Sequence, residues 1–151
     1  MAQPIVISGA LANVRGAVDT EQLLKFLAEE APGVDFYKAT GVMGAAIDWR
    51  GILQDAATVA TIAGLLFTAY TTLIEPGKKD PKSDAGIVVV VQEKGDKPVQ
   101  FWIGKDYKDR EIFIEEFTKE VTRIRKSEEG PSTQEQIIEE TKRSGYWIKI
   151  K

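Results

Sequence analysis

The side chains that most often carry catalysis are missing from this sequence. It contains no histidine and no cysteine among its 151 residues. Without histidine there is no side chain that normally titrates near neutral pH, and neither a Ser-His-Asp nor a Cys-His arrangement can form within the chain. Without cysteine there is no disulfide, no thiolate nucleophile and no cysteine-based zinc or iron–sulfur site. Any metal site would have to use carboxylates alone.

Aspartates are the remaining candidates for metal binding or acid–base chemistry. No two of them have a spacing that requires a shared metal or an acid–base pair. We therefore predict that they cap helices or lie on the solvated surface, and that the protein has no catalytic residue, no metal and no cofactor. An enzyme that uses carboxylates or backbone donors stays open as an alternative. The aspartates weighed in this way are Asp35, Asp48, Asp55, Asp80, Asp84, Asp106 and Asp109.

Two other kinds of site, for phosphate and for nucleic acid, have weaker support in the sequence. The glycine-containing segments 9–16 and 41–44 match neither GxGxxG nor GxxxxGK[ST], so turn geometry explains them better than phosphate binding. Tryptophans such as Trp49 and Trp102 can stack on bases. The net charge of −3, however, opposes binding to a phosphate backbone. We predict no nucleic-acid partner.

The chain begins with a strand, a helix and a strand. The apolar, β-branched run at residues 4–8 is typical of a strand. Asp19 and Gln22 fit a capping box that begins a helix, and the Pro and Gly near residue 33 end it. Residues 34–40 alternate as a second strand does. This order predicts a right-handed βαβ crossover with parallel strands.

The stretch 56–74 contains no charge and no proline, and we predict a long helix from about Ile47 to Ile74. At 100° per residue its threonines and its apolar residues fall on opposite faces, as in a helix that lays one face on a sheet. We predict a soluble, largely buried helix, with a single membrane span over 56–74 as the alternative. The polar face carries Gln54, Thr58, Thr61, Thr68 and Thr72, and the apolar face carries Val59, Ile62, Ala63, Leu66, Tyr70 and Leu73.

The second half of the chain predicts a β-hairpin and two helices. The strands at 87–93 and 99–103 are joined by a turn, and an amphipathic helix follows to Lys126. We therefore predict one α+β domain over residues 1–126: a small mixed sheet with a βαβ start, a long central helix, a β-hairpin and a C-terminal helix packed on the sheet. Residues 127–151 form a helix–strand extension that docks on this sheet or on a partner.

The order of these segments resembles a known family. IVISG, GVMGA, the uncharged helix and IVVVVQEKGDKPVQFWI together resemble the effector-associated constant component domains, which accompany modular bacterial conflict and signalling systems. The resemblance covers Pro4 to Ile124. It implies a non-enzymatic adaptor with no catalytic residues, and it makes Met43 and Gly44 structural or partner-facing. The break after the long helix is Lys-rich with two prolines here, where the family usually has a more Arg-rich break.

We predict a cytoplasmic protein, because the N-terminus lacks a basic region followed by an apolar one. The expected partner is an NTPase, a protease or an effector subunit, and the sequence leaves a small homo-oligomer open. Trp147 has the residue type of an anchor in a partner's pocket. The predicted partner-binding residues are Val42, Met43, Gly44, Tyr146, Trp147 and Ile148.

Overall fold

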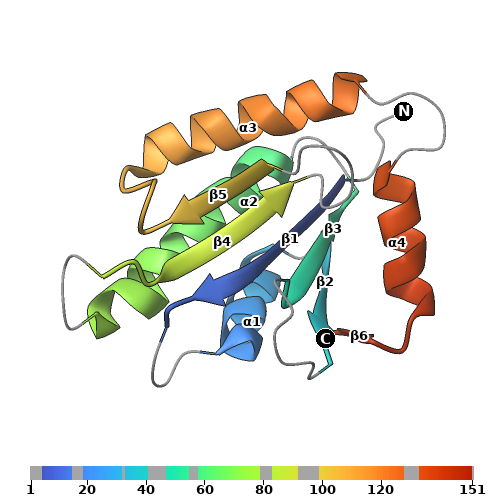
Figure 1. Ribbon diagram of the computed structural model, residues 1–151, viewed down its shortest axis with the longest axis horizontal. Coiled ribbons are helices and arrows are strands. Elements are labelled where there is room, and N and C mark those ends of the chain that lie inside the picture. The colour runs from blue at the N-terminus through green and yellow to red at the C-terminus, as the bar shows by residue number, and fades with distance from the viewer. Residues whose placement is uncertain are drawn as a thin grey trace.

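The protein has an α+β fold, seen here in a computed structural model that describes residues 5–14, 19–31, 33–40, 47–54, 58–78, 83–91, 99–127 and 133–150. A six-stranded sheet is flanked by helices (Figure 1), which confirms the predicted fold class. The strands are β1 (Ile5–Ala12), β2 (Val34–Ala39), β3 (Trp49–Leu53), β4 (Gly86–Val91), β5 (Val99–Ile103) and β6 (Trp147–Lys149). The α-helices are α1 (Thr20–Glu30), α2 (Thr58–Ala69), α3 (Arg110–Ser127) and α4 (Thr133–Arg143).

The sheet is antiparallel between all neighbouring strands, where a mixed sheet was predicted. Its order is β5-β4-β1-β3-β2-β6. Strands β1 and β2 are each antiparallel to β3, which lies between them. They therefore run in the same direction, as a βαβ unit requires, but they do not pair. The prediction of a mixed sheet was wrong because residues 49–53 were expected to lead into the long helix. They form strand β3 instead, between β1 and β2.

The long central helix begins at Thr58 and not near Ile47. After α2 it continues as a π-helical turn, Tyr70–Ile74, and a 3₁₀ turn, Glu75–Gly77. The predicted apolar face is buried, with Ile62 and Leu66 each 0% exposed, whereas Thr61 on the other face is exposed. The predicted division into two faces holds at these positions, but Thr58 and Thr68 of the predicted polar face are half-buried, and Gln54 lies before the helix.

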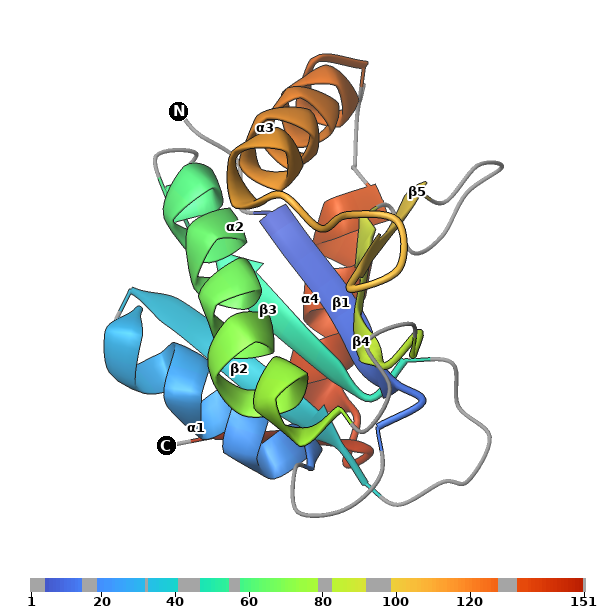
Figure 2. The same ribbon diagram turned by 90° about the vertical axis from the view of Figure 1, so that its left-hand side faces the viewer.

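Helices cover the two faces of the sheet unequally. Residues at alternate positions of β1 point to opposite faces, so Ile7 and Val6 belong to different cores. The larger core joins one face to α1, α2 and α3, which lie together beside the sheet (Figure 2). The smaller core joins the other face to α4 through Ile137. The C-terminal segment is thus packed on the chain's own sheet.

The helical segment formed by α2 and the two turns after it also meets the simplest requirements for a membrane span. The segment Thr58–Gly77 has a mean hydropathy of 1.3 over an 18-residue window, and half of that window is buried inside the protein. A core helix of a soluble protein passes the same test when its apolar face lies against a sheet, as it does here.

Lysine substitutions on the two faces of α2 distinguish a core helix from a membrane span. We expect Thr61→Lys to change the free energy of unfolding by no more than about 0.5 kcal/mol, because the side chain faces solvent. Ile62→Lys would bury an unpaired ammonium and should abolish folding. Urea unfolding in detergent-free buffer measures both. A wild-type chain that stays in solution only with detergent would contradict the core-helix interpretation.

Candidate functional site

The predicted partner-facing residues fall into two groups. Val42, Met43 and Gly44 lie outside the described residues. The other three lie at the end of the chain, where β6 forms one edge of the sheet (Figure 1). Trp147 and Ile148 belong to β6, and Tyr146 immediately precedes it. This edge strand is the candidate site.

The two β6 residues of this set face in opposite directions. Trp147 is 9% exposed and packs in the smaller core, with Tyr146 against it edge to face at 5.3 Å between ring centroids. The Trp147 ring is therefore held by its own chain in this fold. Ile148 points to the other face of the sheet and is 55% exposed. It is the β6 side chain that presents an apolar surface to solvent.

A buried arginine fastens the C-terminal segment to the sheet. Arg50 on β3 is 2% exposed, and its guanidinium carbon lies 4.2 Å from the centroid of the Trp147 ring. Arg50 Nη1 donates a hydrogen bond of 2.8 Å to Thr141 Oγ1 on α4. Arg50 Nη2 is 3.7 Å from Glu140 Oε1. A cation–π contact, one charge-assisted hydrogen bond and an ion pair thus join β3, α4 and β6.

Sequence reasoning missed Arg50 as part of the site. The available signal was a single charge inside the otherwise apolar run WRGIL. A charged residue in a buried strand needs partners, because an unpaired buried charge is strongly unfavourable. Those partners come from α4 and β6, and Thr141 lies 91 residues further along the chain.

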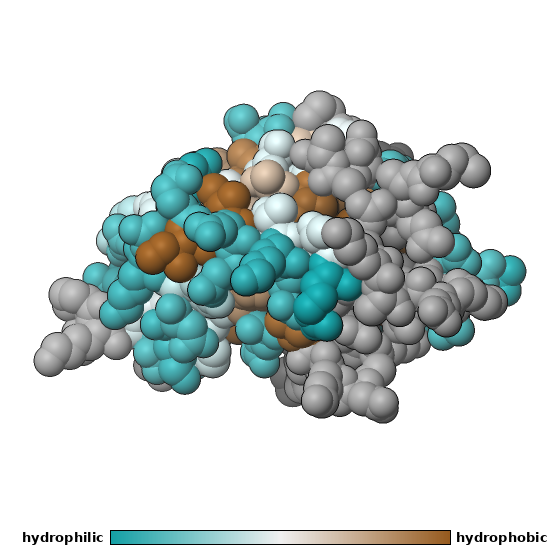
Figure 3. All heavy atoms as spheres, turned by 90° about the horizontal axis from the view of Figure 1, so that it is seen from above, coloured by the Kyte–Doolittle hydropathy of each residue, from teal (hydrophilic) through white to brown (hydrophobic). Residues whose placement is uncertain are grey.

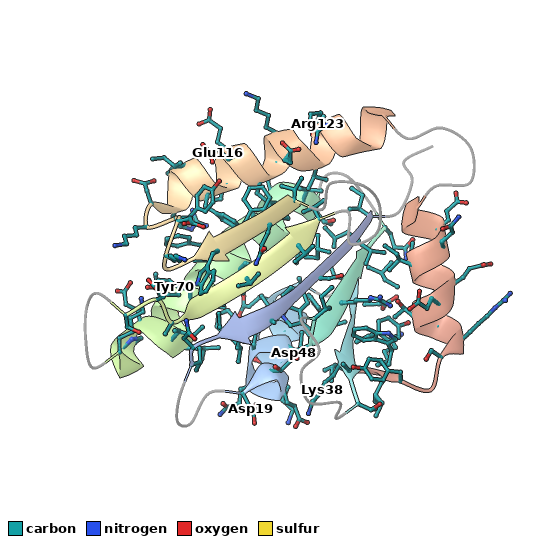
Figure 4. The ribbon with its side chains drawn as sticks, in the orientation of Figure 1. Asp19, Lys38, Asp48, Tyr70, Glu116 and Arg123 are labelled. Atoms are coloured by element: carbon teal, nitrogen blue, oxygen red, sulfur yellow. The ribbon has the colours of Figure 1, made fainter. Side chains whose placement is uncertain are left out.

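The outer edge of β6 carries backbone groups that do not face the sheet. Thr40 N–H donates to the Tyr146 carbonyl at 2.7 Å, and Ile150 N–H donates to the Phe36 carbonyl at 2.8 Å. These bonds flank the pair Lys38↔Ile148, and Lys38 is labelled on β2 in Figure 4. By the alternation of an antiparallel ladder, the backbone groups of Trp147 and Lys149 point away from β2. The Trp147 N–H donates to the Ser144 carbonyl at 3.4 Å, so the Lys149 N–H is the outward donor that a partner strand would meet.

The opposite edge of the sheet, at β5, is partly occupied by the chain itself. The Trp102 carbonyl accepts N–H groups from Asp106 at 3.0 Å and Tyr107 at 3.2 Å. Gly104 N–H donates to the Tyr107 carbonyl at 2.9 Å. The turn after β5 therefore covers the C-terminal half of this edge, a common way of protecting an edge strand from pairing.

Carboxylates do not assemble into a metal site within the described ranges, where no group of three or more metal-ligating side chains occurs. Asp48, directly before β3 (Figure 4), has its pKa raised above the usual range by burial. A single desolvated carboxylate provides neither a metal site nor an acid–base pair.

Tyr107 links the turn after β5 to α3. Its hydroxyl donates to Glu116 Oε2 at 2.5 Å. Burial, together with the hydrogen bond and the charge of Glu116, raises the pKa of Tyr107 from 10.0 to about 12. All three causes favour the protonated phenol.

This raised pKa predicts a loss of stability at alkaline pH. Between pH 10 and 12 the unfolded chain loses the Tyr107 proton while the folded chain keeps it. The contribution of Tyr107 to the free energy of unfolding is therefore complete below pH 10, and it decreases as the pH rises toward 12. We expect Tyr107→Phe to flatten that part of the pH profile in chemical denaturation. Identical slopes for the variant and the wild type would contradict the assignment.

Comparison of the chain with protein-family models, with curated proteins and with solved structures finds no match.

Proposed function

We propose that this protein is a non-enzymatic adaptor that binds a protein partner along the outer edge of β6. The observation that carries the proposal is the contrast between the two edges of the sheet. The turn after β5 covers part of one edge. At β6 the preceding turn takes up the Trp147 N–H, through the Ser144 carbonyl at 3.4 Å, but the Lys149 N–H points outward beside an exposed Ile148. Exposed strand edges bind extended peptides through main-chain hydrogen bonds, and alternate side chains add specificity.

The absence of common catalytic side chains supports an adaptor over an enzyme. The whole sequence lacks histidine and cysteine. The resemblance to effector-associated constant component domains supports a partner that is an NTPase, a protease or an effector subunit of a prokaryotic conflict or signalling system. A cytoplasmic location is part of the same proposal.

The contacts around β6 support a rigid binding edge. Arg50 holds Trp147 from one face of the sheet. Lys149 Nζ lies 3.4 Å from Asp35 Oδ1, which is on the neighbouring strand β2. An edge that is already ordered loses little conformational entropy when it binds, which favours affinity.

Two exposed isoleucines provide a matched test. Ile148 on β6 is 55% exposed, and Ile112 on α3 is 52% exposed. The face of the molecule over α3 is mainly hydrophilic, with hydrophobic residues in small separate patches (Figure 3). We expect Ile148→Asp to weaken partner binding by at least about tenfold, or 1.4 kcal/mol, because it places a charge on the binding edge. Ile112→Asp should leave binding unchanged.

The measurement is capture of the candidate NTPase, protease or effector by each tagged variant. Urea unfolding of both variants checks that stability changes by no more than about 0.5 kcal/mol, as expected for exposed positions. Equal capture by the two variants would contradict the β6 proposal. Failure of the wild-type chain to retain any such partner would contradict the adaptor proposal itself.

A further inference from the structure

An open pocket lies at the C-terminal end of the long helix, near the β5 side of the sheet and away from β6. Its volume is about 390 Å³, within the range of about 300–1,000 Å³ typical of small-molecule sites. The residues that line it come from the π-helical and 3₁₀ turns and from the turn after β5. They are Tyr70, Glu75, Lys78, Gly104 and Lys108.

Tyr70 is held firmly in the wall of this pocket. It is the first residue of the π-helical turn, is 5% exposed, and packs edge to face on Phe67 at 5.9 Å between centroids. Gly104 has φ +105°, and a Cβ there would lie 2.7 Å from the Tyr70 ring. Only glycine combines this backbone conformation with so close an approach. Single π-helical turns occur often at functional sites.

Hydrogen-bond donors converge on the pocket around the Tyr70 hydroxyl, and Tyr70 is labelled in Figure 4. Lys78 Nζ donates to Tyr70 Oη at 2.5 Å and to the Ser83 carbonyl at 3.2 Å. An ammonium has three donors, and within the described part of the chain these bonds use two of them. The third can serve a ligand. Because the Tyr70 oxygen accepts from Lys78, the phenol O–H can donate to the ligand. Lys108 lines this pocket and also the neighbouring one formed by the turn after β5 and the start of α3.

We propose that this pocket binds the phosphate group of a small molecule. Among the described residues that line it, the charged side chains are two lysines and one glutamate, with a formal charge of +2 − 1 = +1. A lysine ammonium acts as a point charge and is a common ligand of phosphate groups. Glu75 supplies an acceptor for a hydroxyl or amino group on the same ligand. The class of ligand is therefore a phosphorylated small molecule with such a group.

Binding is tested on the intact protein, without a partner, by following backbone amide signals during titration. The probes are inorganic phosphate and glycerol phosphate, which carries hydroxyl groups. We expect saturable shifts at Lys78 and Gly104, with tighter binding of glycerol phosphate. Lys108→Met, at an exposed position, should weaken binding by about tenfold. Tyr70→Phe removes only the hydroxyl and should also weaken it.

Lys105→Met is the matched control. Lys105 is an exposed lysine in the same turn, but its ammonium lies 4.6 Å from the centroid of the Trp102 ring and not in the pocket. Its replacement should leave affinity within about twofold of wild type. Shifts that do not saturate, or equal losses for Lys105→Met and Lys108→Met, would overturn the proposal. Neither result bears on partner binding at β6, which this titration does not involve.

Discussion

Alanine at position 9 is expected to lower the free energy of unfolding by about 3 kcal/mol, the upper end of the usual effect of overpacking a core. Gly9 lies on β1, between β4 and β3. A Cβ there would be 2.4 Å from the Val88 carbonyl oxygen and 2.7 Å from the Trp49 ring. Trp49 is 0% exposed, so its ring has no free space to move into. The strain would fall on the centre of the sheet.

Gly145→Ala is the control for this prediction. An added Cβ at Gly145 would meet nothing within 4 Å, so alanine should be neutral, or slightly stabilising because it restricts the unfolded chain. Urea unfolding gives both values when the slopes of the transitions agree. A Gly9→Ala variant as stable as Gly145→Ala would show that Trp49 does not occupy the position described.

Arg50→Ala is expected to cost about 3 kcal/mol of stability. The substitution removes a charge-assisted hydrogen bond to Thr141, worth about 1.5–3 kcal/mol. It also removes the contact with Trp147, which adds up to about 2 kcal/mol in a desolvated setting. Relief of the desolvation of Arg50 offsets part of this loss. The remaining effect should fall mainly on α4 and β6, which Arg50 fastens to β3.

Hydrogen exchange shows whether the Arg50 effect is local. We expect amides in α4 and β6 to exchange faster in Arg50→Ala, while the paired amides of β1 and β4 keep their protection. Arg50→Met keeps most of the side-chain volume and should lose less stability than alanine. Uniformly faster exchange across the whole sheet would contradict a local role.

Elements with strong end signals were predictable from the sequence. The capping box of α1 forms as expected: Asp19 Oδ1 accepts the Gln22 N–H at 2.9 Å, and Gln22 Oε1 accepts the Asp19 N–H at 3.0 Å. The β4–β5 hairpin, α3 and α4 were likewise recognised from turn residues and from apolar spacing. These signals are local in sequence, so they need no knowledge of the fold.

Strand β3 was missed because its residues do not alternate. All five of its residues are buried, including Gly51 and Arg50. A short apolar run of this kind is ambiguous between a strand and a buried helix. Burial on both faces requires α4 on one side and α2 on the other, which only the tertiary structure reveals.

The sequence alone does not decide which residues of the last strand face solvent. In YWIKI, either Trp147 or Ile148 could face the core, and a shift of one residue would exchange them. The pairing Lys38↔Ile148 places Trp147 on the face of the sheet that carries Arg50, and Ile148 on the opposite face. That register is set by long-range contacts, which local patterns do not contain.

The most direct test of the adaptor account is hydrogen exchange of the protein alone and in complex with its partner. If the partner adds a strand to β6, the Lys149 amide, which points away from β2, should become protected on binding. The amides of β5 should exchange at unchanged rates. Protection that appears at β5 or over α3, with the Lys149 amide unaffected, would contradict the account.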